Sequence, residues 1–215
     1  MTVINLSEQP SLLSQYLKEI RSKHIQRDPL RFRRNIERIG QLMAYEVSKA
    51  LQYRPENIET PLAMTQVATI QDPIVLGTVL RAGLPMHQGF LSMYDLAENA
   101  FLSAYRKMGL NGLEIVSEYL AAPNLTGKTL ILVDPMLATG MSMEVAYEAL
   151  LKHGTPKSLH ICCIIGTEQA VSFLDGNMPN DAFLWCAAID PELNDKKYIV
   201  PGLGDAGDLC FGTKL

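Results

Sequence analysis

Residues 129–145, TLILVDPMLATGMSMEV, combine hydrogen-bond donors and an acid in a spacing suited to a sugar phosphate. An apolar run that fits a buried strand ends at Asp134. A small loop follows it, and Thr139 and Ser142 stand just before a helical pattern. The loop N–H groups and the helix N-terminus concentrate positive partial charge at one point, and the two hydroxyls add donors there. Asp134 could accept from sugar hydroxyls. An ordinary strand-to-helix turn with a capping serine fits the same pattern.

Two arginines could add positive charge at the same place. Arg81 follows the strand-like run 74–80, and Arg106 ends a second predicted strand. Because the carboxyl ends of parallel strands meet at one edge of a sheet, Arg81 can converge there with Asp134. A guanidinium can then fork onto diphosphate oxygens. From the pattern alone, a surface position explains Arg81 equally well, and it is the favoured interpretation of Arg106.

Three stretches are similar to one known enzyme family. They are residues 133–140 (VDPMLATG), 79–84 (VLRAGL) and 198–214 (YIVPGLGDAGDLCFGTK). Together they resemble the uracil phosphoribosyltransferases, which join uracil to phosphoribosyl diphosphate (PRPP) and release UMP and diphosphate. The resemblance extends from about the first arginine-rich helix to the last residue, and the third stretch is its most specific part.

This resemblance implies the residues that bind PRPP. Arg81, Arg106 and Asp205 are expected to act at the reacting groups, because the arginines neutralise the departing diphosphate and Asp205 faces the ribose. The 5-phosphate and the sugar are assigned to the loop residues Asp134, Pro135, Met136, Leu137, Ala138, Thr139, Gly140, Met141 and Ser142. Mg²⁺ is the implied cofactor, held mainly by PRPP oxygens and not directly by the protein.

The resemblance assigns uracil to the C-terminal tail, at Ile199, Gly204, Asp205 and Ala206. Small residues let a backbone approach a planar ring closely. A backbone N–H aimed at O4 and a carbonyl aimed at N3–H would select uracil. Cytosine would leave both groups unpaired, at roughly 1–3 kcal/mol each. Taken by itself, the tail also fits a disordered glycine-rich terminus.

The sequence departs from the family in two places. The phosphate loop reads Thr139-Gly140-Met141-Ser142, where the family commonly has TGGS. A positive φ at Met141 would be strained, whereas with a negative φ only its N–H matters. The hairpin after Arg106 is glycine-rich where familiar members carry acidic residues. The sequence therefore does not decide whether this hairpin acts as a lid or whether GTP activates the enzyme.

The order of the expected elements predicts an α/β fold with an open, mainly parallel central sheet flanked by helices, like that of type I phosphoribosyltransferases. A β-hairpin arm and a small hood built from the termini complete it. We expect strands at 64–70, 74–80, 98–105, 114–121, 130–133, 158–165 and 183–189, helices at 11–23, 29–47, 85–93, 145–153 and 168–174, and a linker at 54–61.

Residues 1–215 are expected to form one phosphoribosyltransferase domain. The helices within residues 11–52 would be an appendage, and residues 198–215 the base-binding tail. The family implies a homo-oligomer, a dimer or tetramer, and the arginine-rich helix that starts at Pro29 is a candidate interface.

Composition excludes several function classes. The net charge of -4 argues against general nucleic-acid binding. The start of the chain lacks a secretory pattern, and no apolar run approaches the ~20 residues that cross a bilayer. The four cysteines show no metal-ligand spacing, so we expect reduced core thiols in a cytoplasmic enzyme.

Two other readings remain open. A related enzyme could transfer the phosphoribosyl group to another base, although the tail argues against it. A non-catalytic regulator that senses uracil nucleotides and binds RNA or a protein could share the fold, although the chain lacks a basic, aromatic-rich patch.

Overall fold

The computed structural model describes residues 1–103, 105–109, 112–116 and 119–213, with the backbone alone for 105–109 and 112–116. Its central sheet has the order β1-β12-β11-β9-β4-β5-β8, and β10 pairs with the end of β11. All pairings are parallel except that of β8 with β5. The strands are β1 (Thr2–Asn5), β4 (Ile74–Leu80), β5 (Glu98–Ser103), β8 (Leu120–Ala121), β9 (Thr129–Val133), β10 (Met136–Leu137), β11 (Ser158–Thr167) and β12 (Phe183–Asp190).

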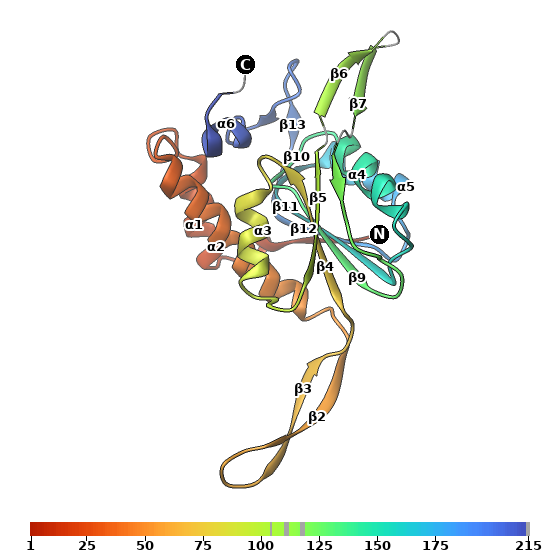
Figure 1. Cartoon of the computed structure of the whole chain (residues 1–215). Coiled ribbons are helices and arrows are strands. Elements are labelled where there is room, and N and C mark those ends of the chain that lie inside the picture. Colours follow the sequence, from red (N-terminus) through yellow and green to blue (C-terminus); the bar gives the residue numbers. More distant parts are fainter. Residues whose placement is uncertain (104, 110–111, 117–118, 214–215) are drawn as a thin grey trace.

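Helices cover both faces of this sheet, which confirms the predicted fold class (Figure 1). Side chains alternate along the central strands, so Ile131 and Val133 of β9 enter one core cluster and Leu130 and Leu132 the other. The first cluster packs against α1 (Leu12–Arg21), α2 (Pro29–Ser48) and α3 (Leu84–Leu91). The second packs against α4 (Met141–Leu151) and α5 (Glu168–Asn177).

Local capping fixes where the first two long helices begin. The side chain of Ser11 accepts from Leu13 N, and Ser14 returns a bond to the Ser11 N–H. Asp28 accepts from two backbone N–H groups of the next turn, and Pro29 occupies the first helical position, where its missing N–H costs nothing. Both predicted helices are confirmed.

The predicted linker at 54–61 is wrong. Residues Tyr53–Glu59 form β2, which pairs antiparallel with β3 (Met64–Ile70) in a long hairpin that projects away from the sheet (Figure 1). Pro55 argued against a strand, because proline cannot donate to a ladder. In a two-stranded ribbon both strands are edges, so this loss is tolerated.

The predicted strands 98–105 and 114–121 do pair, but residues expected to connect them are themselves in strands, so the hairpin continues as a second pair of strands. Strand β6 (Tyr105–Gly109) pairs antiparallel with β7 (Gly112–Val116), and Arg106 is opposite Ile115. The dipeptide Asn111-Gly112 is a turn signal that predicts the end of this hairpin, and Asn111 lies outside the described residues.

The two chain ends add elements that the sequence did not predict. Strand β1 extends the sheet beside β12 and leads into the 3-10 turn η1 (Leu6–Glu8). Near the C-terminus, β13 (Glu192–Leu193) pairs with β14 (Ile199–Val200), the first element of the tail, and the short helix α6 (Ala206–Phe211) follows. Among the described residues, no helix is both long and apolar enough to span a membrane.

Candidate active site

The phosphate loop is built around Gly140, which precedes α4 with φ 80. This left-handed conformation suits glycine, and a Cβ there would lie 2.9 Å from Phe173 Cδ1. Met141 has no positive φ and its side chain is exposed, so the departure from TGGS causes no backbone strain. No side chain caps α4, and the N-terminus of the helix is therefore open to an anion.

Asp134 lies between β9 and β10, half-buried at the base of the loop. Its Oδ1 accepts from the Met136 N–H at 3.2 Å. Burial raises the pKa of the Asp134 carboxyl to about 7, and the hydrogen bond from Met136 acts in the opposite direction. Hydroxyl groups that donate hydrogen bonds to Asp134 would stabilise its ionised form, because they replace the water that burial removes.

A cavity of about 560 Å³ joins the phosphate loop to the tail. Asp134 and Ser142 line it from the loop side, and Gly204, Asp205 and Ala206 line it from the tail. The complete lining is Ala82, Asp134, Met136, Ala138, Ser142, Lys196, Lys197, Tyr198, Ile199, Gly204, Asp205, Ala206 and Gly207. Segments far apart in the sequence therefore share one crevice, at the carboxyl ends of the parallel strands.

Met136 and Ala138 of the loop also line the cavity, whereas five other loop residues of the predicted site do not. Pro135 and Gly140 are buried, and Leu137 packs in the second core cluster. Thr139 is half-buried but not in the cavity wall, and Met141 points to solvent. They shape the loop, whose ligand-facing groups are then Asp134, Ser142 and the backbone.

Arg81 lies beside the cavity rather than in its wall. Its Nη2 donates to Asp208 Oδ1 at 3.3 Å and its Nη1 to the Gly212 carbonyl at 3.4 Å, so the guanidinium contacts the tail. The turn after it is tight, because a Cβ on Gly83 would lie 2.2 Å from Thr78 Oγ1. Arg106 is placed by the backbone of β6 alone.

The tail is held in its own turns. Asp205 caps α6, where its Oδ1 accepts from Asp208 N at 2.9 Å. Gly202 and Gly204 both have positive φ values, 55° and 96°. Ile199 and Ala206 are buried around them. All four predicted uracil residues, Ile199 and 204–206, line the cavity.

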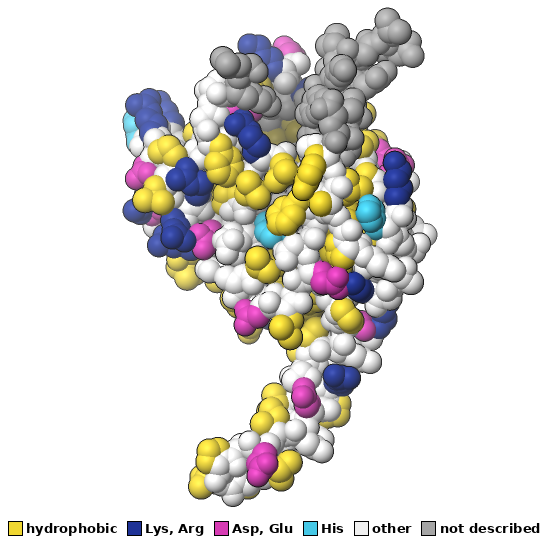
Figure 2. Space-filling view, in the orientation of Figure 1, with side chains coloured by type: hydrophobic (Ala, Val, Ile, Leu, Met, Phe, Trp, Pro, Cys, Tyr) yellow, Lys and Arg dark blue, Asp and Glu magenta, His cyan; other side chains and the backbone are white. Residues whose placement is uncertain are grey.

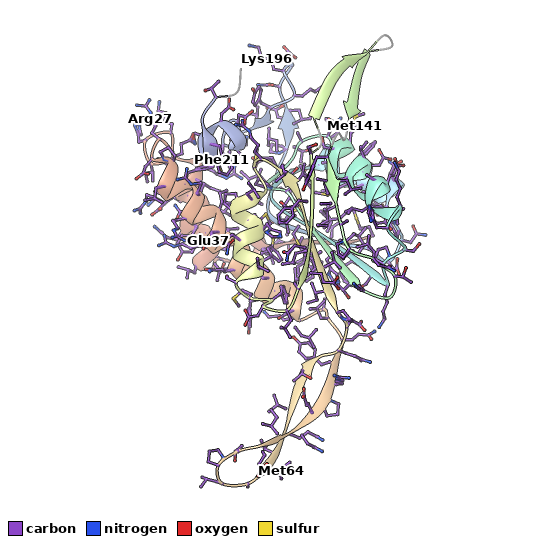
Figure 3. All side chains as sticks on the ribbon, viewed as in Figure 1. Arg27, Glu37, Met64, Met141, Lys196 and Phe211 are labelled. Carbon is purple, nitrogen blue, oxygen red and sulfur yellow. The ribbon has the colours of Figure 1, made fainter. Side chains whose placement is uncertain are left out.

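Sequence reasoning missed the two lysines of the cavity. Lys196 and Lys197 lie in the turn between β13 and β14 and line the cavity. Figure 3 shows Lys196 near the upper edge of the molecule. The Asn194 side chain accepts from the N–H groups of Lys196 and Tyr198, both at 3.0 Å, and so fixes this turn. The paired lysines after an Asn-Asp turn signal were the available clue.

Comparison of the sequence with known proteins identifies a family. A sequence model of uracil phosphoribosyltransferase matches residues 7–213. The chain belongs to the uracil phosphoribosyltransferase family. A uracil phosphoribosyltransferase of Porphyromonas gingivalis is 54% identical over 217 residues, covering 100% of both chains. One of Methanothermobacter thermautotrophicus is 37% identical over 203 residues, covering 94% of this chain and 92% of its own.

Among solved structures, the AQ2163 protein of Aquifex aeolicus superimposes with a TM-score of 0.88 at 27% identity, covering 100% of each chain. Membership in the uracil phosphoribosyltransferase family makes the chain a phosphoribosyltransferase, whose reaction converts PRPP and uracil into UMP and diphosphate. The sequence resemblance is thereby confirmed.

Proposed function

We propose that the cavity between the phosphate loop and the tail is the site of this reaction and binds PRPP and uracil side by side. The observation that carries the proposal is its shared wall, in which Asp134 and Ser142 face the segment Gly204–Ala206. A cavity that holds both reactants replaces a bimolecular encounter by an oriented one, which is a large part of the catalysis expected here.

The 5-phosphate is assigned to the open N-terminus of α4. The first-turn N–H groups, with the hydroxyl of Ser142, would satisfy its oxygens. Asp134 would accept from the ribose hydroxyls, and at neutral pH its raised pKa makes this hydrogen bond sensitive to pH.

Uracil is assigned to the tail. Ile199 and Ala206 give the ring an apolar surface, and the Gly204 backbone can approach the edge of the ring without a Cβ in the way. Selection of uracil over cytosine then comes from backbone donors and acceptors whose direction the tail fixes.

The diphosphate is assigned to Arg81 and Arg106. To reach it, Arg81 must leave Asp208 and Gly212, and an exposed ion pair of this kind opposes that by only about 0–1 kcal/mol. As the bond from C1 of the ribose to the diphosphate breaks, N1 of uracil bonds to C1, and the N1 proton passes to the departing diphosphate. The arginines stabilise the negative charge that leaves, and Asp205 holds the ribose.

Mg²⁺ fits this site as a partner of PRPP. The cavity wall presents the carboxylates of Asp134 and Asp205, which are hard oxygen acceptors suited to the waters of a magnesium ion. When bound, the ion would neutralise charge on the diphosphate.

The assignment of the tail is tested with Ala206→Val. Ala206 lines the cavity and is only 3% exposed, so the two added methyl groups must displace either a cavity ligand or the core residues packed against it. We expect PRPP-dependent formation of UMP from uracil to need about tenfold more uracil, with the KM for PRPP within about twofold of wild type. Cytosine serves as the control base. An unchanged KM for uracil would show that the tail does not enclose the ring.

We propose further that the enzyme is a homo-oligomer whose contact is the β2–β3 hairpin. An isolated two-stranded hairpin is marginal in water, and this one carries apolar side chains at its exposed end, with Leu62 97% and Met64 65% exposed (Figures 2 and 3). Three arginines of α2 instead have partners within the chain: Arg31 with Glu19, Arg33 with the Cys210 carbonyl, and Arg34 with Glu37.

The oligomer proposal is tested by sedimentation of Leu62→Asp and Met64→Asp. Charge at the end of the hairpin should shift the protein to a smaller species. Gln66→Asp on the same hairpin is the control and should shift it less, because the Gln66 side chain is polar and already donates to Asn57 within the hairpin. A sedimentation coefficient that neither apolar variant changes would place the contact elsewhere.

We also assign the enzyme to the cytoplasm. Its four cysteines are buried and free, and Cys163 and Cys186 remain thiols with their sulfurs 3.3 Å apart. Burial raises the pKa of Cys163 well above its usual range, so its thiol stays protonated. Two neighbouring thiols that are not oxidised to a disulfide are typical of a reducing compartment. Localisation of a fluorescent fusion tests this assignment.

A further inference from the structure

One buried ion pair joins the N-terminal helices to the end of the sheet. Arg21, the last residue of α1, donates from Nη1 and Nη2 to the two carboxylate oxygens of Asp190, each at 2.8 Å. The side chains are 24% and 7% exposed, so the pair is largely removed from water. A bidentate guanidinium–carboxylate contact also fixes the relative orientation of the two groups.

The same pair holds both polar backbone groups of Gly202. The Gly202 N–H donates to Asp190 Oδ2 at 2.8 Å, and the Gly202 carbonyl accepts from Arg21 Nη1 at 3.1 Å. Gly202 has φ 55, and a Cβ there would lie 2.1 Å from the Ile199 carbonyl oxygen. The backbone of the tail is therefore set at this residue by a charged pair rather than by a strand ladder.

Two more side chains from the N-terminal segment bind the tail close by. Gln26 donates to the Leu203 carbonyl at 3.2 Å, and Arg33 donates to the Cys210 carbonyl at 2.6 Å. Figure 1 shows α6 beside the ends of α1 and α2. The residues of the tail that line the cavity, Gly204–Ala206, lie between these points of attachment.

We propose that Arg21, acting through Asp190 and Gly202, is a positioning residue for the pyrimidine site. It never touches the base. It fixes the tail so that the backbone donors and acceptors of residues 204–206 keep the direction that distinguishes uracil from cytosine. This inference rests on the assignment of the tail to uracil.

A second ion pair on the same helices provides a matched control. Arg31 of α2 also binds a carboxylate with two bonds, from Nε to Glu19 Oε2 at 2.9 Å and from Nη2 to Oε1 at 2.7 Å. It joins α2 to α1 and, among the described residues, makes no hydrogen bond or ion pair with the tail. A purely stabilising role would make the two pairs alike in their kinetic effect.

The experiment compares Arg21→Met with Arg31→Met in the full-length enzyme, with kcat and KM measured for uracil and for PRPP. For Arg21→Met we expect the KM for uracil to rise about tenfold or more, the ratio of kcat/KM for uracil to that for cytosine to fall, and the KM for PRPP to change by less than about twofold. For Arg31→Met we expect all three to stay within about twofold.

Arg21→Lys and the charge-neutral double variant Arg21→Met with Asp190→Asn cover the case in which the single variant does not fold. Lysine keeps the charge but not the fork, so we expect a smaller rise in the KM for uracil than with methionine. Equal changes in both KM values, or changes matched by Arg31→Met, would overturn the positioning role. If Ala206→Val raises the KM for uracil and the Arg21 variants do not, the pocket stands and the positioning role fails; if none of them raises it, the pocket assignment fails as well.

Discussion

Replacing Asp134 by Asn should stabilise the ligand-free enzyme, and the gain should grow with pH. Burial raises the pKa of this carboxyl from 3.8 to about 7. Below pH 3.8 the group is protonated in both the folded and the unfolded chain, so it adds no penalty. Between the two values the unfolded chain releases the proton while the folded chain keeps it, so the free energy of unfolding falls as pH rises, and above about 7 the loss is constant.

The size of the effect follows from the two pKa values. The penalty is about 1.7 kcal/mol at pH 5 and about 4 kcal/mol at pH 8. Asp134 keeps part of its surface on the cavity, where water solvates the carboxylate, so these values are upper bounds. Asparagine removes the charge and keeps an oxygen for the Met136 N–H. The gain from Asp134→Asn should therefore increase by up to about 2–3 kcal/mol between pH 5 and pH 8.

Urea unfolding of wild type and Asp134→Asn at several pH values between 5 and 8.5 measures this difference directly. Asp95→Asn is the matched control, since Asp95 is exposed in the turn after α3. A gain that does not vary with pH, or a loss of stability at pH 8, would refute the reasoning from burial. Saturating PRPP should reduce the gain, because a bound ribose gives the ionised carboxylate donors that asparagine uses less well.

Two further substitutions test the loops around the cavity. Arg81→Ala removes a cation assigned to the diphosphate, and kcat/KM for PRPP should fall by roughly 10- to 150-fold, as for loss of a charged hydrogen bond; a near-normal rate at saturating PRPP would exclude Arg81 from the mechanism. Gly140→Ala forces an L residue to φ 80 and brings a Cβ to 2.9 Å from Phe173, so unfolding in urea should show a loss of about 2 kcal/mol. Gly176→Ala in α5 is its control, because nothing lies within 4 Å of that Cβ and alanine favours a helix, so its stability should be unchanged or higher.

The sequence predicted secondary structure best where burial or helix capping allows only one type of element. The run Ile74–Leu80 is a buried apolar strand with the predicted bounds, and Ser11 and Pro29 mark helix starts through local hydrogen bonds. These signals depend on residues a few positions apart. The family resemblance added the segments that meet at the cavity.

Elements that depend on distant partners were not predictable from the sequence. The strand Thr2–Asn5 is short and becomes a strand only because β12 offers it an edge. Pro55 argues against a strand at β2, because proline cannot donate to a strand ladder. Gly207 argues against the helix that begins at Ala206, because glycine is a poor helix former. The contact between Arg21 and Asp190 spans 169 positions, and no local pattern indicates which of several acids an arginine will find.

The attachment of the tail to α1 and α2 has a consequence for how the protein is made. The helices α1 and α2 emerge from the ribosome before the groups that they hold at Gly202, Leu203 and Cys210. A nascent chain can assemble most of the sheet and still have no place for the nucleobase. The nucleobase site is therefore complete only after the tail has left the ribosome and met α1 and α2.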